Sequence, residues 1–190
     1  MLIEMVIISI ISLIILMIRK RKTVILSKID IEIKGYKIII IMAIIEITAQ
    51  FLFKRFNNSN LLQILSLNWL IYLGILIIAI INIKKHYMKI FLIGTLLNFI
   101  AIITNNFKMP VLVSESLLNY KANILFLKSG QDLVHSLLTD ATHFKILCDI
   151  ITLPPPYPFV KAISIGDVFL LIGVFIFWQE TFGNKERENA

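Results

Sequence analysis

Residues 61–83 read LLQILSLNWLIYLGILIIAIINI, an apolar run without a single charged residue. An α-helix rises ~1.5 Å per residue, so roughly 20 such residues cross the ~30 Å hydrocarbon core of a bilayer. Comparable apolar runs occupy residues 2–18, 36–53, 88–104 and 163–178. A backbone surrounded by lipid must satisfy its own hydrogen bonds, and these runs lack the alternation of barrel strands. The sequence therefore predicts five transmembrane helices.

The composition agrees with a membrane protein. Of the 190 residues, 58% are hydrophobic and only 16% are charged, which is too little polar surface to cover a water-soluble fold. We expect a single all-α integral membrane domain over residues 1–190, multi-pass in the cytoplasmic membrane. The net charge of +7 gathers beside the ends of the runs, where it sets topology and attracts anionic lipid headgroups. We expect membrane lipids as partners, and no nucleic acid.

Basic residues predict the orientation, because positively charged loops stay in the cytoplasm. They crowd the connection between the first two runs and the one between the third and fourth: Arg19, Lys20, Arg21, Lys22, Lys28, Lys34, Lys37, Lys84, Lys85 and Lys89. Both connections should be cytoplasmic. The N-terminus and the long loop 105–164 would then lie outside, and the C-terminus inside.

Three of the polar residues within the apolar runs are candidates for a function inside the membrane. Glu46 and Gln50 are four residues apart, which places them on one helix face, and Asn98 lies in the fourth run. Burying an acid in lipid is costly, so these side chains should face other helices or a polar cavity. They could contact a proton or substrate in a small transporter, or they could form interhelical hydrogen bonds.

The loop 105–164 shows helical spacing from Gln131 to Cys148, with apolar residues on one side. The opposite side carries Asp132, His135, Ser136, Thr139, Asp140 and His143. This pattern predicts an amphipathic helix lying at the outer interface, and Asn106 adds to the same outer polar face. Each histidine follows an aspartate by three residues, as in a chelating pair. On a straight helix, however, the two histidines would be about 12 Å apart, so we expect no shared metal ion.

The last run begins with Ser164-Ile165-Gly166-Asp167, a pattern typical of a capping box in which the serine and the acid three residues later bond to each other's backbone. Four prolines precede it and form a stiff connection: Pro154, Pro155, Pro156 and Pro158. Cys148 is the sole cysteine, so the chain cannot form an internal disulfide.

Three segments resemble a family of bacterial membrane proteins classed as a domain of unknown function: NNFKMPV at 105–111, LCDIITLP at 147–154 and SIGDV at 164–168. The chain departs from that pattern at Asn106-Phe107, where Asn-Gly is expected. The resemblance implies an uncharacterised bacterial integral membrane protein and assigns no catalytic residue.

The C-terminal third is also similar to lipoprotein signal peptidase, a membrane aspartyl protease. By position, Asp149 and Asp167 would be its paired carboxylates, and Asp140 would match a non-catalytic aspartate. Ser164 stands where that family has Asn, Ala141 stands where it has Arg, and this chain has five runs where that family has four. The resemblance implies that one carboxyl acts as acid while the other, as base, activates water.

Two principal hypotheses remain open, together with the transporter. In the first, the outer loop packs on the helices and binds a lipid, a small ligand or a partner membrane protein. In the second, Asp149 and Asp167 hydrolyse a lipid-linked or transmembrane substrate at the outer surface. Neither requires a cofactor.

Overall fold

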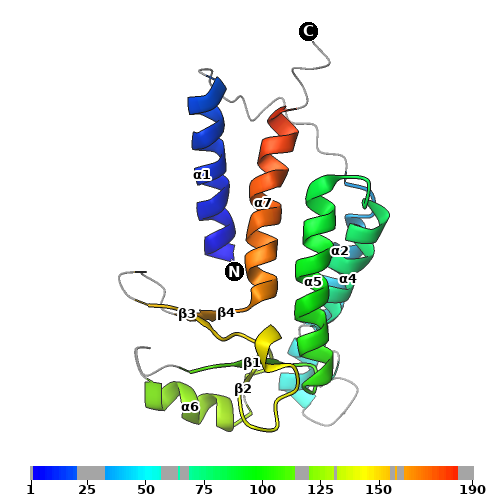
Figure 1. Ribbon diagram of the computed structural model, residues 1–190. Coiled ribbons are helices and arrows are strands. Elements are labelled where there is room, and N and C mark those ends of the chain that lie inside the picture. Colours follow the sequence, from blue (N-terminus) through cyan, green and yellow to red (C-terminus); the bar gives the residue numbers. More distant parts are fainter. Residues whose placement is uncertain are drawn as a thin grey trace.

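The computed structural model describes residues 2–20, 33–56, 64, 69–113, 120–130, 132–154, 157 and 161–183. In this part of the chain the protein is mostly helical, with long helices side by side and short strands gathered at one end (Figure 1). The elements are α1 (Leu2–Lys20), α2 (Lys37–Phe56), α4 (Trp69–Ile81), α5 (His86–Thr104), β1 (Met109–Val111), α6 (Tyr120–Lys128), β2 (His135–Leu137), η2 (Lys145–Leu147), β3 (Ile151–Leu153), β4 (Lys161–Ile163) and α7 (Ile165–Gly183).

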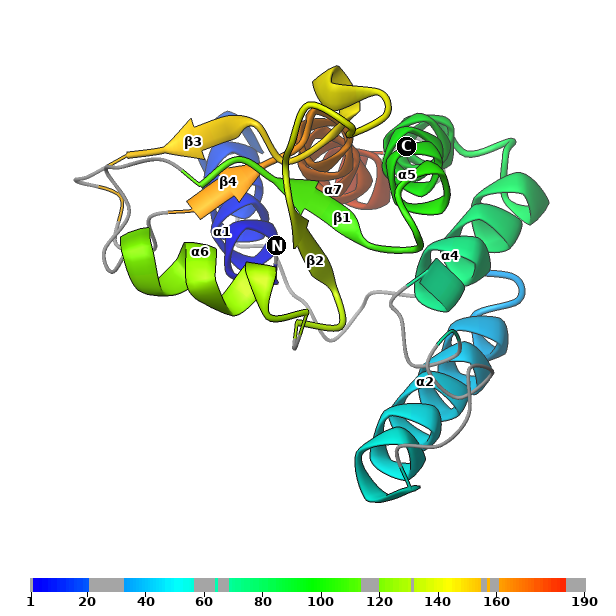
Figure 2. The same cartoon turned by 90° about the horizontal axis from the view of Figure 1, so that it is seen from below.

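The long helices form a row. α1 packs on α7, α7 on α5, α5 on α4, and α4 on α2. Seen along the helix axes, α1 and α2 stand at opposite ends of this row (Figure 2). A row leaves wide helix faces uncovered by protein, and these faces carry exposed isoleucines, most densely on α1 and α2.

Each predicted apolar run contains a helix. α4 begins at Trp69, and residues 61–63 and 65–68 of its predicted run lie outside the described residues. α7 continues to Gly183, beyond the predicted end at residue 178. Among the described residues, α5 and α7 are the helices long and apolar enough to cross a membrane by length and composition, and α4 is a shorter apolar helix.

The prediction of an all-α protein was wrong for the connecting segment, residues 105–164. β1 pairs in parallel with β2, β3 pairs antiparallel with β4, and a bridge between Val111 and Asp149 joins the two pairs. The strands are only three residues long, which is why they left no alternating pattern in the sequence.

The predicted amphipathic helix from Gln131 to Cys148 was also wrong. The Asp132 carboxylate accepts the backbone N–H groups of Val134 and His135, at 2.7 and 2.9 Å, and so forms a turn that leads into β2. Aspartate competes with helix formation in just this way, by bonding to backbone two and three residues ahead. After β2 the chain turns again and forms only the short 3-10 helix η2, preceded by Phe144 at φ +47°.

Asn105 anchors this segment to the end of α5. Its side chain pairs with the backbone of His143 in both directions, through Nδ2 to the carbonyl at 3.0 Å and through Oδ1 from the N–H at 2.9 Å. The next two residues, Asn106 and Phe107, both have positive φ, at 57° and 60°. The expected Asn-Gly therefore falls where glycine is easiest to accommodate, and here the Phe107 ring packs against Trp69 at 5.5 Å between centroids.

Candidate functional site

The connecting segment meets the row of helices beside a close approach of α5 and α7, two of its inner helices. A Cβ atom on Gly94 would lie 2.6 Å from the Gly166 carbonyl oxygen, and one on Gly166 would lie 2.6 Å from the Gly94 carbonyl oxygen and overlap the Asn98 amide. No side chain fits between them. Small residues allow helix backbones to approach in this way, and here the approach brings Asn98 beside the first turn of α7.

Asn98 joins a closed network of buried polar groups. Its Nδ2 donates to Asp167 Oδ1 at 2.8 Å, and its Oδ1 accepts the Ser164 hydroxyl at 2.7 Å. The Asp167 N–H donates to Ser164 Oγ at 2.9 Å, and the Ser164 N–H donates to Asp167 Oδ2 at 3.4 Å. The predicted capping box is confirmed, and Asn98 extends it to a second helix.

Asp149 reaches the same place from the connecting segment. Its N–H donates to the Pro110 carbonyl at 3.0 Å, and its carbonyl accepts the Leu112 N–H at 2.8 Å, so its backbone is fixed on the free side of β1. The residue is only 7% exposed, and its Oδ1 has no hydrogen-bond partner among the described residues. Burial, reinforced by the nearby charge of Asp167, raises the pKa of Asp149 to about 8, although Lys161 opposes the rise.

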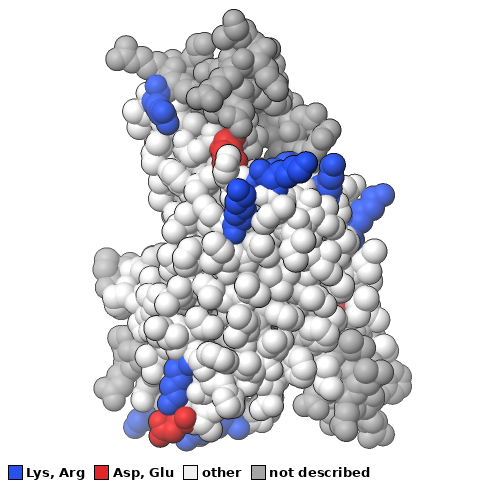
Figure 3. Space-filling view, turned by 45° about the vertical axis from the view of Figure 1, so that its right-hand side comes forward, with Lys and Arg blue, Asp and Glu red and all other residues white. Residues whose placement is uncertain are grey.

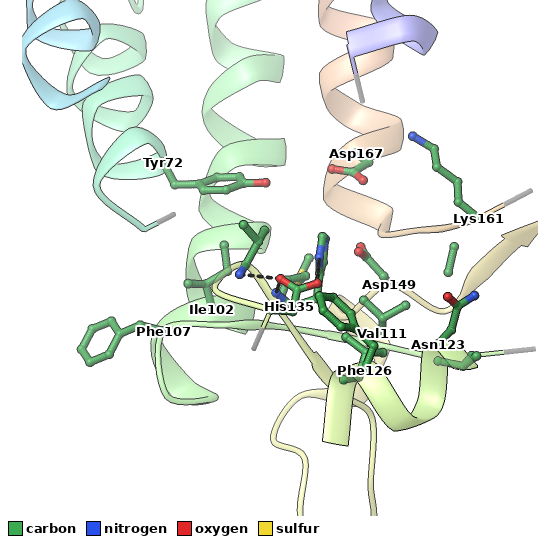
Figure 4. A pocket seen from close by; sticks show the side chains of 16 residues that line it. Tyr72, Ile102, Phe107, Val111, Asn123, Phe126, His135, Asp149, Lys161 and Asp167 are labelled. Carbon is green, nitrogen blue, oxygen red and sulfur yellow. Dashed lines mark hydrogen bonds and ion pairs between the residues drawn. The ribbon is translucent and has the colours of Figure 1, made fainter. Parts of the chain in front are cut away.

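Asp149 and Asp167 line one cavity of about 560 Å³. Figure 4 shows Asp149, Asp167 and Lys161 along one side of it, with the Tyr72 hydroxyl directed toward them from α4. The remaining walls are mainly apolar and come from α5, β1, α6 and β2. They include Ile102, Phe107, Met109, Val111, Val113, Phe126, Leu127 and Val134. The site thus combines a polar end with an apolar compartment, as ligand sites commonly do.

The two Asp-x-x-His motifs lie in different surroundings. His135 lines the cavity, and its Nδ1 lies 3.2 Å from Asp132 Oδ2. Burial alone would raise the pKa of Asp132, but the backbone N–H groups of His135 and Val134 outweigh it, so the pKa is lowered. Asp140 is exposed and lies 3.4 Å from Lys145. No group of three or more His, Cys, Asp or Glu side chains that could hold a metal ion occurs among the described residues.

The remaining predicted residues lie outside the cavity lining. Gln50 donates to Glu46 Oε1 at 3.2 Å within α2, and Glu46 is buried. Asn106 is part of the turn after α5, and His143 is held through its backbone by Asn105. Asn98 lies beside Asp167 and bonds to it, whereas Glu46 and Gln50 bond to each other within α2.

The sequence did not single out Tyr72, Lys161 or Glu4 as members of this region. Tyr72 lies in the apolar run 61–83, where its hydroxyl could have indicated a side chain that faces a polar site. Lys161 binds Glu4, which is 157 positions away, and no local pattern predicts a pair so distant in the chain.

The single buried cysteine is adjacent to this site. Burial, together with the charge of Asp149, raises the pKa of the Cys148 thiol to about 11. Because the thiolate is the reactive form, this cysteine is a packing residue and not a nucleophile.

Comparison with known proteins gives a family without an assigned activity. Residues 30–179 match the family of unknown function DUF5317. An uncharacterised protein of Thermotoga maritima is 31% identical over 90 residues, which is 47% of this chain and 49% of that protein. The chain thus matches about half the length of this relative. No solved structure matches. The matched range begins before α2 and ends within the last turns of α7, so it covers most of the chain. The chain therefore belongs to the DUF5317 family of unknown function.

Proposed function

We propose that this protein is an integral membrane protein in which α1, α2, α4, α5 and α7 cross the bilayer. The pattern of burial supports this. α1 buries Glu4, Ser12 and Leu16 and exposes nearly all its isoleucines, and α2 buries Glu46 and Ala49 while exposing Ile40, Ile41, Ile44, Ile45, Ile47 and Phe51. A surface helix of a water-soluble protein buries its apolar side chains and exposes its polar ones, and α1 and α2 do the reverse. Such an arrangement is favourable when lipid surrounds the helices.

The distribution of charge gives the proposed orientation. On the face seen in Figure 3, Lys and Arg gather toward the two ends and a broad band without charge separates them. Lys84, Lys85 and Lys89 lie at the end remote from the strands. Because positively charged loops tend to stay in the cytoplasm, we propose that this end is cytoplasmic and that the cavity lies at the outer surface.

We propose that the cavity is the active site of an aspartyl hydrolase of the outer membrane surface. One observation carries this proposal: two carboxyl groups from separate segments line the same cavity, and one of them has a buried oxygen without a partner among the described residues. An unpaired buried carboxyl oxygen costs about 1–3 kcal/mol or more, and such costs are typical of sites that pair with a substrate.

The hydrogen bonds assign different roles to the two carboxyl groups. Asp167 accepts bonds from the Asn98 amide and the Ser164 N–H, which suit its carboxylate form. Asp149, with a pKa of about 8, keeps its proton at neutral pH. One carboxyl group that holds a proton beside another that accepts hydrogen bonds on both oxygens is a usual arrangement of an acid and a base.

The proposed reaction is hydrolysis of an amide. Asp167 takes a proton from water, the hydroxide oxygen bonds to the carbonyl carbon, and Asp149 gives its proton to the carbonyl oxygen. The tetrahedral intermediate then returns that proton to Asp149, the C–N bond breaks, and the leaving nitrogen takes the proton from Asp167. A carboxylic acid and an amine result, and both aspartates are restored.

The test compares protein termini in membranes from cells that produce the natural protein, Asp149→Asn, Asp167→Asn or Glu46→Gln at equal folded amounts. Mass spectrometry of N-terminal peptides should reveal termini present with the natural protein and Glu46→Gln, and absent with both aspartate variants. If no terminus depends on both aspartates, the peptidase proposal is wrong.

A binding function without chemistry is the second candidate. Phe144 and Ile146 are 58% and 64% exposed around η2, which packs against both α5 and α7. These side chains would extend the apolar helix surface into the outer headgroup region and bind a lipid or a partner membrane protein there. Phe144→Ser/Ile146→Ser should then reduce the lipids that copurify with the protein, and each aspartate variant should alter stability without a shared loss of activity.

A further inference from the structure

A second polar cluster connects α1 to the wall of the cavity. Glu4, in the first turn of α1, accepts the Lys161 ammonium at 2.8 Å on Oε2 and the Tyr157 hydroxyl on Oε1. Glu4 is only 6% exposed. Burial alone would lower the pKa of the Lys161 ammonium, but the hydrogen bond to Glu4 and the surrounding negative charge contribute to an opposing rise, and the pKa is raised overall. Lys161 is therefore a charged group held at a fixed place.

The fixed place of Lys161 matters because the same side chain lines the cavity. Figure 4 shows Lys161 rising from β4 beside Asp149 and Asp167, and its ammonium is bound by Glu4 at the start of α1. A lysine beside a buried acid would ordinarily pair with it, and such a pairing favours the ionised acid.

We propose that Glu4 is a positioning residue, which holds the Lys161 ammonium on α1 and thereby leaves Asp149 protonated and free to act as the acid. This inference rests on the proposed hydrolase. It assigns to α1 a role in the site, although α1 lies outside the residues matched by the family.

Two charged side chains of the described residues act on Asp149 in opposite directions. Among the described residues, Asp167 on α7 opposes ionisation of Asp149, and Lys161 on β4 favours it. Tyr72 on α4 faces the same carboxyl groups as a neutral hydroxyl, and Cys148 beside it is a neutral thiol. Release of Lys161 would therefore shift the balance toward the ionised form of Asp149.

The test is the carboxyl titration of Asp149 in the full chain, labelled with ¹³C-aspartate in lipid nanodiscs and assigned by loss of the resonance in Asp149→Asn. Glu4→Gln should lower the pKa of Asp149 by ~1–3 units, the usual effect of an adjacent cation. Glu4→Gln/Lys161→Met should return it to the natural value or above, because the released cation is then absent.

Two results would overturn the inference. One is an unchanged Asp149 titration in folded Glu4→Gln, and the other is a lowered pKa that persists in the double variant. If Glu4→Gln does not fold, Glu4→Asp keeps the charge but shortens its reach, and it should shift the titration in the same direction by less. The titration can be measured without any enzymatic turnover. If Glu4→Gln shifts the pKa of Asp149 as expected but no protein terminus depends on the two aspartates, the hydrolase proposal is refuted and the positioning role of Glu4 still holds.

Discussion

Two acidic sites lie among the helices, and they are built in opposite ways. At the cavity, Asp167, Asn98 and Asp149 come from α7, α5 and the connecting segment. In α2, Glu46 bonds to Gln50 one turn away. Both sites contain a buried carboxyl oxygen without a partner among the described residues, at Asp149 and at Glu46. Among the described residues, the first site also lines a cavity, contains a second carboxyl group and has a hydrogen-bond network that fixes it.

An unpaired buried acid, which both sites contain, therefore does not identify a functional site by itself. Convergence of side chains from separate segments is the more informative feature, because each segment must be held in place to bring them together. The small-residue contact of Gly94 with Gly166 and the bridge of Asp149 to β1 both serve that convergence. In the described part of the chain, Glu46 accepts a hydrogen bond from Gln50 of the same helix.

The largest expected effect separates the two sites by activity. Asp149→Asn or Asp167→Asn should reduce cleavage of a dependent substrate by about 10³-fold, because either change removes the acid or the base. Glu46→Gln should leave the rate within about threefold, since it touches neither proton transfer. Rates on one substrate, measured at equal folded concentrations, check this. Equal losses in all three variants would erase the distinction.

The second effect concerns the contact that supports the cavity. Gly166→Ala should destabilise the protein by about 3 kcal/mol, because the new methyl group overlaps Asn98 and the Gly94 carbonyl. The matched control is Gly173→Ala on the same helix, whose new methyl group would have the movable Phe91 ring as its nearest neighbour, at 3.1 Å, and should cost less than half as much. Unfolding in bicelles measures both. Equal costs would show that the Gly94–Gly166 approach is not special.

The third effect is the dependence of stability on pH. The pKa of Asp149 is raised from its ordinary value to about 8, so the folded state binds the proton more tightly than the unfolded state. This contribution is complete below about pH 4 and is lost as the pH rises through about 8. Between pH 6 and 7.5 the free energy of unfolding should fall by about 2 kcal/mol.

Asp149→Asn should remove most of this slope, whereas Asp140→Asn, at an exposed position, should retain it. Unfolding curves across that pH range provide the measurement. A slope that survives in Asp149→Asn would assign the titration to another group.

The smallest effect is expected in α2. Glu46→Gln should change the free energy of unfolding by less than about 1 kcal/mol, because the amide can keep a hydrogen bond to Gln50 and removes an unpaired carboxyl oxygen. Unfolding under the conditions used for Gly166→Ala measures it. A loss of several kcal/mol would show that Glu46 has a structural partner of the kind that Asp167 has.

The sequence predicted the helices well and the segment between α5 and α7 poorly, for physical reasons. Long apolar runs specify helices locally, because each backbone group bonds within its own run. The spacing of residues 131–148 was also helical, but Asp132 bonds to the backbone ahead of it and Asn105 holds the backbone of His143. These bonds outweigh the local preference for a helix. β1 and β2 are too short to have a period of their own.

The site could be predicted in part. Asp167 was recognisable from its capping motif, and Asp149 from a resemblance in spacing. The link from Asn98 to Asp167 spans 69 positions and depends on a helix contact made by two glycines, which no local pattern contains. The pair of Glu4 and Lys161 was beyond prediction for the same reason.

The most direct test of the central claim, that Asp149 and Asp167 act as one pair, is the Asp149 carboxyl titration in Asp167→Asn. We predict that Asp149 of the natural protein titrates near pH 8 and that Asp167→Asn lowers its pKa by about one unit or more, because a neighbouring negative charge is removed. Glu46→Gln should leave the value unchanged. An Asp149 that titrates near pH 4 in the natural protein, or that does not respond to Asp167→Asn, would contradict the paired site.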